Sequence, residues 1–259
     1  MNRLGPYEVG GELARGAMGV VYRARDPFLD RPLALKVIGA DAFDAEGQER
    51  FRREALVLAR LRHTRIVAVH GAGLTSQGLP YLVMDLVSGG SLGERLQQGP
   101  LPPREAVRFA AQVAEATAYA HTQGVLHRDI KPANVLIDGS GGAILSDFGL
   151  AKLVGEERLT QTGDILGTPS YMAPEQVRGT LDYTPAVDVY ALGATLFHML
   201  TGRPPLQAPT TTELFMKVLE EVPPPASQFV AGIDEELEVI LARSLAKDPK
   251  ARYFRMDDF

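Results

Sequence analysis

The sequence predicts an α+β fold in which a small β-rich part is followed by a larger, mainly helical part. Up to residue 85, the apolar runs are short and are separated by Gly, Pro and Asp, as is typical of strands. After Ser88-Gly89-Gly90 the apolar patterns become long and follow the helical period. A chain of 259 residues is long enough for one or two packed units.

Five strands and one helix are predicted in the first part. The strands cover residues 7–13, 20–25, 33–38, 66–70 and 81–85. Between residues 46 and 62, one face of an amphipathic helix carries Phe51, Glu54, Ala55 and Leu58. Glu54 brings a carboxylate into this apolar stripe, where it needs a partner because an unpaired buried charge is costly.

Helices dominate the predicted second part. Pro102 and Pro103 suit the start of a helix that stops near Gly124, with an apolar stripe formed by Val107, Ala110, Ala111, Ala114 and Ala118. Residues 186–200 form a second, well-buried helix that is too short to span a membrane. Two proline-rich linkers, 203–209 and 222–225, precede further helices at 212–221 and 234–246.

Composition narrows the class of protein. A net charge of -5 provides no basic field of the kind that nucleic-acid binding requires. The absence of cysteine excludes disulfides, thiolate metal sites and a cysteine nucleophile. The start lacks the apolar core of a secretory signal, and no apolar stretch approaches the roughly 18–20 residues of a membrane span. We therefore expect a soluble, intracellular protein without nucleic-acid partners.

The stretch LARGAMGVV at residues 13–21 is a candidate phosphate-binding loop. Gly16, Gly19 and Val21 fit the kinase loop pattern G-x-G-x-x-G-x-V, but Ala14 stands in place of the first glycine. Taken alone the match is weak, because the chain contains 26 glycines. An ordinary hairpin turn that uses the conformational freedom of glycine is the better explanation of this stretch by itself.

Three further motifs, taken in order, carry the strongest signal. HRDIKPAN occupies residues 127–134, SDFG residues 146–149 and APE residues 173–175. Chance alone produces the first pattern about 0.002 times in a chain of this length. The order and spacing match the protein-kinase signature set. The chain therefore resembles a eukaryotic-type (Hanks-type) protein Ser/Thr kinase catalytic domain, most like the bacterial members, over nearly its whole length.

The resemblance implies a bilobal protein-kinase-like fold, with the whole chain, 1–259, as one kinase domain. The small N-lobe with one long helix would cover about 1–85, the hinge about 85–90 and the larger helical C-lobe about 91–259. ATP would bind in the cleft between the lobes. The nucleotide-binding residues that the resemblance implies are Leu13, Ala14, Gly16, Gly19, Val21, Ala34, Lys36, Met84, Asp85, Val87, Leu136 and Asp147.

The catalytic residues implied by the resemblance have the chemistry that phosphoryl transfer needs. The reaction requires a cation for the phosphates and a carboxylate for the acceptor hydroxyl. Lys36 matches the lysine that contacts the α- and β-phosphates, and Glu54 matches its partner. Asp129 matches the aspartate that orients the acceptor hydroxyl and takes up its proton. Lys131 resembles the lysine that steadies the γ-phosphate.

The resemblance implies two side chains with oxygen atoms as the metal ligands. Asn134 and Asp147 supply the hard oxygen ligands that suit Mg2+, or Mn2+ in its place. The resemblance therefore implies ATP and a divalent cation as the small-molecule requirements of the domain.

The segment between SDFG and APE contains candidate phosphorylation sites. Thr160 and Thr162 match the positions of activation-loop phosphosites in bacterial members, although threonines in a polar loop are more often merely solvated. Arg128 is the expected docking cation for such a phosphate. Thr168 resembles the residue that bridges toward Asp129 and Lys131 in Ser/Thr kinases, so Ser or Thr is the expected acceptor.

Other matches are architectural. Asp188 resembles the buried aspartate that braces the catalytic loop, and Glu175 would pair with Arg252. Met84 occupies the gatekeeper position before a hinge whose backbone groups would bind adenine. A methionine in the core explains Met84 as well, and both interpretations are compatible.

Three functions remain to be compared. An active Ser/Thr protein kinase, regulated by activation-loop autophosphorylation, is favoured because the catalytic and metal-binding residues are all present. A pseudokinase would lack at least one of them, and a small-molecule kinase would not need the GTPSYMAPE segment that docks a polypeptide in this family. The expected partners are ATP, protein substrates with Ser or Thr acceptors, and a second copy for trans-autophosphorylation. The expected location is cytoplasmic, or membrane-tethered if the chain belongs to a longer protein.

Overall fold

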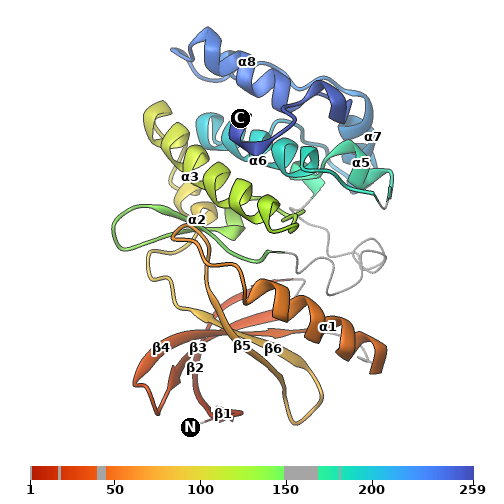
Figure 1. Cartoon of the computed structure of the whole chain (residues 1–259). Coiled ribbons are helices and arrows are strands. Elements are labelled where there is room, and N and C mark those ends of the chain that lie inside the picture. The colour runs from red at the N-terminus through yellow and green to blue at the C-terminus, as the bar shows by residue number, and fades with distance from the viewer. Residues whose placement is uncertain (1, 17–18, 40–44, 149–168, 181) are drawn as a thin grey trace. The chain divides into compact units, whose positions relative to one another are not determined.

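The computed structural model describes residues 2–16, 19–39, 45–148, 169–180 and 182–259. The chain divides into two compact units (Figure 1). Met1–Ser88 belongs to the first, whereas Gly89–Phe148 and the stretch that ends at Phe259 belong to the second. The narrower limits predicted for an N-lobe, a hinge and a C-lobe stay predictions.

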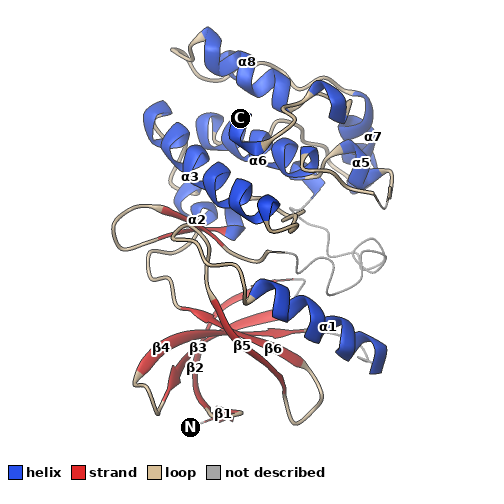
Figure 2. Cartoon of the chain, in the orientation of Figure 1, coloured by secondary structure: helices blue, strands red, loops and turns tan. Residues whose placement is uncertain are grey.

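The first unit is built on a six-stranded sheet with the strand order β1-β2-β3-β4-β6-β5 (Figure 2). All neighbouring strands in it are antiparallel. The strands are β1 (Asn2–Leu4), β2 (Tyr7–Gly16), β3 (Gly19–Asp26), β4 (Arg31–Ile38), β5 (Val69–Leu74) and β6 (Pro80–Asp85). Helix α1 (Ala45–Leu58) packs against β5 and β6.

Strand register sorts the side chains of this sheet onto two faces. Paired residues point to the same face, and successive residues alternate between faces. One face carries an apolar cluster that includes Leu33, Leu35 and Val83. The opposite face carries Ala34, Lys36 and their partners on β6, Met84 and Leu82. The single lysine in the buried run of β4 therefore lies on the face opposite to the apolar cluster.

The second unit is mainly helical. Its helices are α2 (Leu92–Leu96), α3 (Pro103–Thr122), α5 (Pro174–Val177), α6 (Ala186–Thr201), α7 (Thr211–Glu220) and α8 (Glu235–Ser244). Short 3-10 turns are η1 (Pro132–Asn134), η3 (Pro169–Tyr171), η4 (Ala226–Gln228), η5 (Pro249–Ala251) and η6 (Met256–Asp258). Strands β7 (Val135–Ile137) and β8 (Ala143–Leu145) form a small hairpin. The predicted α+β class is confirmed.

Helix α6 is the central element of the second unit. Fourteen of its residues are buried, and it contacts α3, α8 and four of the short turns. Because it is apolar on every side, it packs inside a layer of helices rather than on their surface. Within the described residues, no helix is both long and apolar enough to cross a membrane.

Two sequence predictions were wrong in detail. The stripe of α3 is shifted, since Val107 is 45% exposed and Ala111 is exposed, while Ala110 and Phe109 are buried. The strand predicted at 66–70 lies instead at β5, because ladder pairing with β6 begins only at Val69.

Candidate active site

The catalytic loop is anchored on the buried carboxylate of Asp188 in α6. The backbone N–H of His127 donates to Asp188 Oδ2 at 2.9 Å, and that of Arg128 donates to Oδ1 at 2.7 Å. His121 Nε2, from the last turn of α3, lies 2.8 Å from Oδ2. Burial is the largest single influence and raises the pKa of Asp188, but the interactions with His121 and with His127, including its backbone N–H, together outweigh it, so the pKa is lowered. The carboxylate is thus an ionised anchor for the loop.

His127 fixes the conformation of the loop from within. It is fully buried, and its Nε2–H donates to the carbonyl oxygen of Ser146 at 2.8 Å. Its Nδ1 accepts the backbone N–H of Asp129 at 3.2 Å. Both contacts require the neutral tautomer with its proton on Nε2. The ring of Phe148 lies 4.6 Å from the imidazole, centroid to centroid. The imidazole therefore ties the HRD segment to the SDFG segment.

The Asp129 carboxylate receives two donors on one oxygen. Lys131 Nζ lies 2.8 Å from Asp129 Oδ2, and Asn134 Nδ2 donates to the same oxygen at 3.0 Å. Asn134 Nδ2 also donates to the backbone carbonyl of Asp129 at 2.7 Å. The structure thus brings together three of the predicted catalytic residues, with the carboxylate held in one orientation.

The β7–β8 hairpin explains why Asn134 and Asp147 lie at the same end of a small sheet. Its register pairs Val135 with Leu145, so the residues just outside the pair are Asn134 and Ser146. The backbone N–H and the hydroxyl of Ser146 both donate to the carbonyl of Asn134 at 2.9 Å. Asp147 follows directly, with a left-handed φ of 64°. The two predicted metal ligands therefore leave the same end of the hairpin.

The donor set fits a hard divalent cation. The amide nitrogen of Asn134 is committed to Asp129, which leaves the amide oxygen as the atom available to a metal. A carboxylate and an amide oxygen are ligands that Mg2+ accepts, with phosphate oxygens and water completing the shell. In the part of the chain that the structure describes, no group of three or more His, Cys, Asp or Glu residues could hold a metal ion.

Strand register determines where the predicted nucleotide-binding residues of the first unit lie. Ala14 pairs with Val21, Val21 with Lys36, and Lys36 with Leu82. These four residues form one row across β2, β3, β4 and β6, on one face of the sheet. Ala34 and Met84 form a second paired row on this face, which we call the nucleotide face.

Burial differs along the nucleotide face. Lys36, Ala34 and Met84 are 5%, 6% and 7% exposed, respectively. Leu13 is 41% exposed, and Ala14 and Gly16 are exposed too. Glu54 is half-buried on α1 in the same unit, and its pairing with Lys36 stays a prediction. Val87 and Asp85, both half-buried, belong to the segment predicted as the hinge.

The glycine-rich stretch forms the β2–β3 hairpin. Gly16 pairs with Gly19, whose φ is 132°. A Cβ on Gly19 would lie 2.0 Å from the carbonyl oxygen of Val37, so the position excludes side chains. Ala14 has no left-handed φ and sits in the ladder opposite Val21. Its methyl group therefore replaces glycine at a position where the backbone does not require one.

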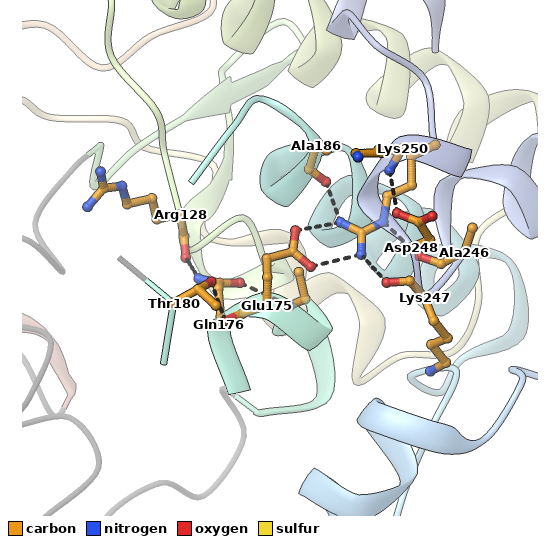
Figure 3. Close-up of polar contacts among 11 residues, drawn as sticks. Arg128, Glu175, Gln176, Thr180, Ala186, Ala246, Lys247, Asp248 and Lys250 are labelled. Carbon is orange, nitrogen blue, oxygen red and sulfur yellow. Dashed lines mark hydrogen bonds and ion pairs between the residues drawn. The ribbon is translucent and has the colours of Figure 1, made fainter. Parts of the chain in front are cut away.

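A buried ion pair supports the APE segment. Arg252 donates through Nη1 and Nη2 to the two carboxylate oxygens of Glu175, at 2.7 and 2.9 Å. The same guanidinium donates to the carbonyls of Ala186, Ala246 and Lys247, as the contacts around these residues in Figure 3 show. The guanidinium therefore joins the start of α5, the start of α6 and the segment after α8, which bears out the pair that the sequence suggests.

Gln176 was missed by sequence reasoning. Its Nε2 donates to the carbonyl of Arg128 at 2.8 Å, and its Oε1 accepts the N–H of Ala173 at 3.0 Å (Figure 3). Arg128 has a left-handed φ of 65°, and its guanidinium stacks over the ring of Tyr183 at 5.1 Å. His121 was also missed. No local pattern marks either residue, because their partners lie 48 and 67 residues away.

Some predicted residues cannot be placed in this way. Thr160, Thr162 and Thr168 lie outside the described residues. Leu136 is half-buried on β7, in the second unit, where it forms an isolated bridge with Ser91.

Comparisons with known proteins agree with this geometry. Residues 7–256 match the family model described as the protein kinase domain. The serine/threonine-protein kinase PknB of Mycobacterium leprae is 40% identical over 253 residues, which cover 95% of this chain and 40% of PknB. PrkC of Bacillus subtilis is 38% identical over 256 residues, which cover 98% of this chain and 39% of PrkC. The chain thus spans about two fifths of these two relatives.

Solved structures show the same fold. The crystal structure of the Mycobacterium tuberculosis PknI kinase domain matches with a TM-score of 0.79 and 33% identity, over 99% of this chain and 94% of that one. The predicted kinase-like fold is therefore confirmed. On these grounds, with a family model that matches nearly every residue, the chain belongs to the protein kinase domain family and is similar to the bacterial serine/threonine-protein kinases.

Proposed function

We propose that the chain is an ATP-dependent kinase domain that transfers the γ-phosphoryl group to Ser or Thr hydroxyls of proteins. The observation that carries the proposal is the Asp129 carboxylate, held by Lys131 and Asn134 in a loop anchored on buried Asp188. Phosphoryl transfer leaves little covalent work for a protein beyond positioning and charge stabilisation, and this loop provides both. PknB and PrkC are serine/threonine-protein kinases, which favours the same acceptors here.

The residues of the chain divide the work. Asp129 would orient the acceptor hydroxyl and accept its proton. Lys131, 2.8 Å from Asp129 Oδ2, would donate a hydrogen bond to the γ-phosphate when the nucleotide binds and would stabilise its negative charge. Lys36 would contact the α- and β-phosphates from the nucleotide face. Asn134 and Asp147 would hold Mg2+ or Mn2+, which neutralises charge on the phosphates when bound.

Regulation and partners form the finer part of the proposal. Phosphorylation at Thr160 or Thr162 would give Arg128 a dianionic partner for charge-assisted hydrogen bonds. Autophosphorylation in trans requires two copies of the chain to meet, so a transient homodimer is the expected intermediate. We place the domain in the cytoplasm, tethered to a membrane if the chain is part of a longer protein.

The test is phosphorylation of the purified chain with Mg2+ and ATP, read by mass spectrometry. We expect phosphate on Thr160 or Thr162 in the wild type and none in Asp129→Asn, because the amide cannot accept the hydroxyl proton. Asp257→Asn, which removes an exposed carboxylate, is the matched control and should behave as wild type. ATP binding without phosphate on any residue or on a generic protein substrate would instead show a pseudokinase.

A further inference from the structure

Two side chains from the neighbouring strands contact the Asp85 carboxylate. Arg31 Nη2 lies 2.6 Å from Asp85 Oδ1, and His70 Nε2 lies 2.8 Å from the same oxygen. Arg31 begins β4, His70 is the second residue of β5 and Asp85 ends β6. Because the strand order is β4-β6-β5, the three side chains brace adjacent strands. The brace lies where the chain leaves the sheet toward the predicted hinge.

The carboxylate points away from the nucleotide face. Asp85 pairs with Leu33, whereas Met84, the residue before it, pairs with Ala34 on the nucleotide face. Leu33 belongs to the apolar cluster of the opposite face. The Asp85 side chain is thus on the face away from Lys36, and any effect on a nucleotide has to pass through its backbone. That backbone is fixed on one side, because its N–H donates to the carbonyl of Ala68 at 3.0 Å.

We propose that Arg31, His70 and Asp85 form a hinge brace, a set of positioning residues that fixes the backbone of Asp85 for adenine recognition. This inference rests on the proposed function, since it assigns the adenine ring to the hinge backbone. The brace holds the carboxylate on one face, which sets the direction of the peptide group that enters the hinge. Without the brace, the hinge backbone samples more conformations, and adenine binding has to order it.

The size of the effect follows from exposure. The side chains of Arg31, Asp85 and His70 are 46%, 39% and 22% exposed. Exposed ion pairs contribute little to stability, so the brace is not a major determinant of folding. A role restricted to stability would leave ATP affinity unchanged, whereas a positioning role changes the affinity and leaves the unfolding temperature nearly constant. The two explanations therefore separate in one set of variants.

The experiment compares wild type, Asp85→Ala, Arg31→Gln and the double variant by calorimetric binding of Mg·ATP, by steady-state kinetics and by the temperature of thermal unfolding. We expect each single variant to raise the Kd and the KM for ATP about three- to tenfold, as the loss of one or two such contacts allows. The double variant should be no worse than Asp85→Ala, because both changes remove the same contact. The KM for the protein substrate should stay constant.

The matched control is Asp30→Asn. It removes the carboxylate that pairs with Arg25 in the turn between β3 and β4, an exposed pair in the same unit. Its Kd for ATP should equal that of wild type. Equal ATP affinity in Asp85→Ala and wild type, or additive losses in the double variant, would overturn the hinge brace alone. A wild type that binds no ATP would overturn the proposed function, and the brace with it.

Discussion

The catalytic loop and the nucleotide face are positioned by different means. The loop is held by a buried polar side chain far away in sequence, that of Asp188, which lies 61 residues from His127 and is itself contacted by His121. The nucleotide face is arranged by the register of neighbouring strands, and its outer part, at Leu13 and Ala14, is exposed. The loop therefore depends on a few polar anchors, whereas the nucleotide face depends on the pairing of its strands. Substitutions should therefore cost most in the loop and least at the edge of the hairpin.

Asp188→Asn should have the largest effect. The amide cannot accept three donors as a carboxylate does, so buried N–H groups lose partners, at a cost of about 3–5 kcal/mol in unfolding free energy. We expect kcat to fall about 100-fold, because a displacement of the loop of about 1 Å has that consequence. Denaturant unfolding and steady-state kinetics measure both. Glu236→Gln, an exposed change on α8, is the control. Wild-type kcat in Asp188→Asn would contradict the anchor role.

The same carboxylate gives the stability a pH dependence of known sign. The pKa of Asp188 is lower in the folded protein than its ordinary value of 3.8. The contribution of Asp188 to the free energy of unfolding is therefore complete above that value, and it is lost as the pH falls through the pKa of the folded state. Unfolding free energies measured from pH 6 downward should decline less in Asp188→Asn than in wild type. Parallel curves would show that the carboxylate does not carry the acid sensitivity.

Glu175→Gln should cost less, about 2–3 kcal/mol, because the amide retains one of the two bonds to Arg252 while the guanidinium stays buried. The matched control is Glu221→Gln, which breaks an exposed pair with Lys217 at 3.3 Å. The control should change the unfolding free energy by under about 0.5 kcal/mol. Chemical denaturation measures the free energy of unfolding of both variants. Equal losses in the two would contradict the view that burial makes the Glu175–Arg252 pair important.

Gly19→Ala changes the β2–β3 hairpin of the first unit. The new Cβ would overlap the carbonyl of Val37 at a φ of 132°, so the hairpin must shift at a cost of about 1–3 kcal/mol. Gly11→Ala on the same strand pair, where a Cβ meets nothing within 4 Å, is the control. We expect the unfolding temperature to fall only in Gly19→Ala, and the KM for ATP to rise in the same variant.

Ala14→Gly should have the smallest effect. The backbone of Ala14 is in an ordinary conformation, so glycine adds flexibility worth about 0.5–1 kcal/mol and no new contact. The KM for ATP should change by no more than several-fold. A hundredfold gain in kcat/KM would mean that the natural hairpin is impaired, and it would place the limiting step at the edge of the nucleotide face.

Sequence reasoning located the long elements well, because their periodicity is strong. It misplaced the stripe of α3 because alanine occupies most of its faces, and the side chain that decides the orientation is Phe109. It misplaced β5 because Gly71 and Gly73 make a true strand look like a loop. It also missed the short pieces α2, β7 and β8, which are held by tertiary contacts rather than by propensity.

Some residues of the candidate site could be predicted from the sequence and others could not. The HRD, SDFG and APE motifs are local in sequence, so the residues of the loop could be named in advance. The brace of Arg31, His70 and Asp85 could not, because register places these residues together and no pattern in the chain marks them. Gln176 and His121 were missed for the same reason. Distances in sequence of 15 to 67 residues separate these partners.

The contacts of Arg252 have a consequence for the order in which the chain is made. Its guanidinium receives Glu175 from 77 residues earlier and the carbonyl of Ala186 from 66 residues earlier. During synthesis, these groups leave the ribosome long before their partner does, so the Glu175 carboxylate in α5 and the Ala186 carbonyl at the start of α6 are without it until then. Since contacts between residues distant in sequence form last, the second unit can complete these contacts only after residue 252 has been made and has left the ribosome. A ribosome that stalls before position 252 would hold the second unit without the contacts that join α5, α6 and the segment after α8.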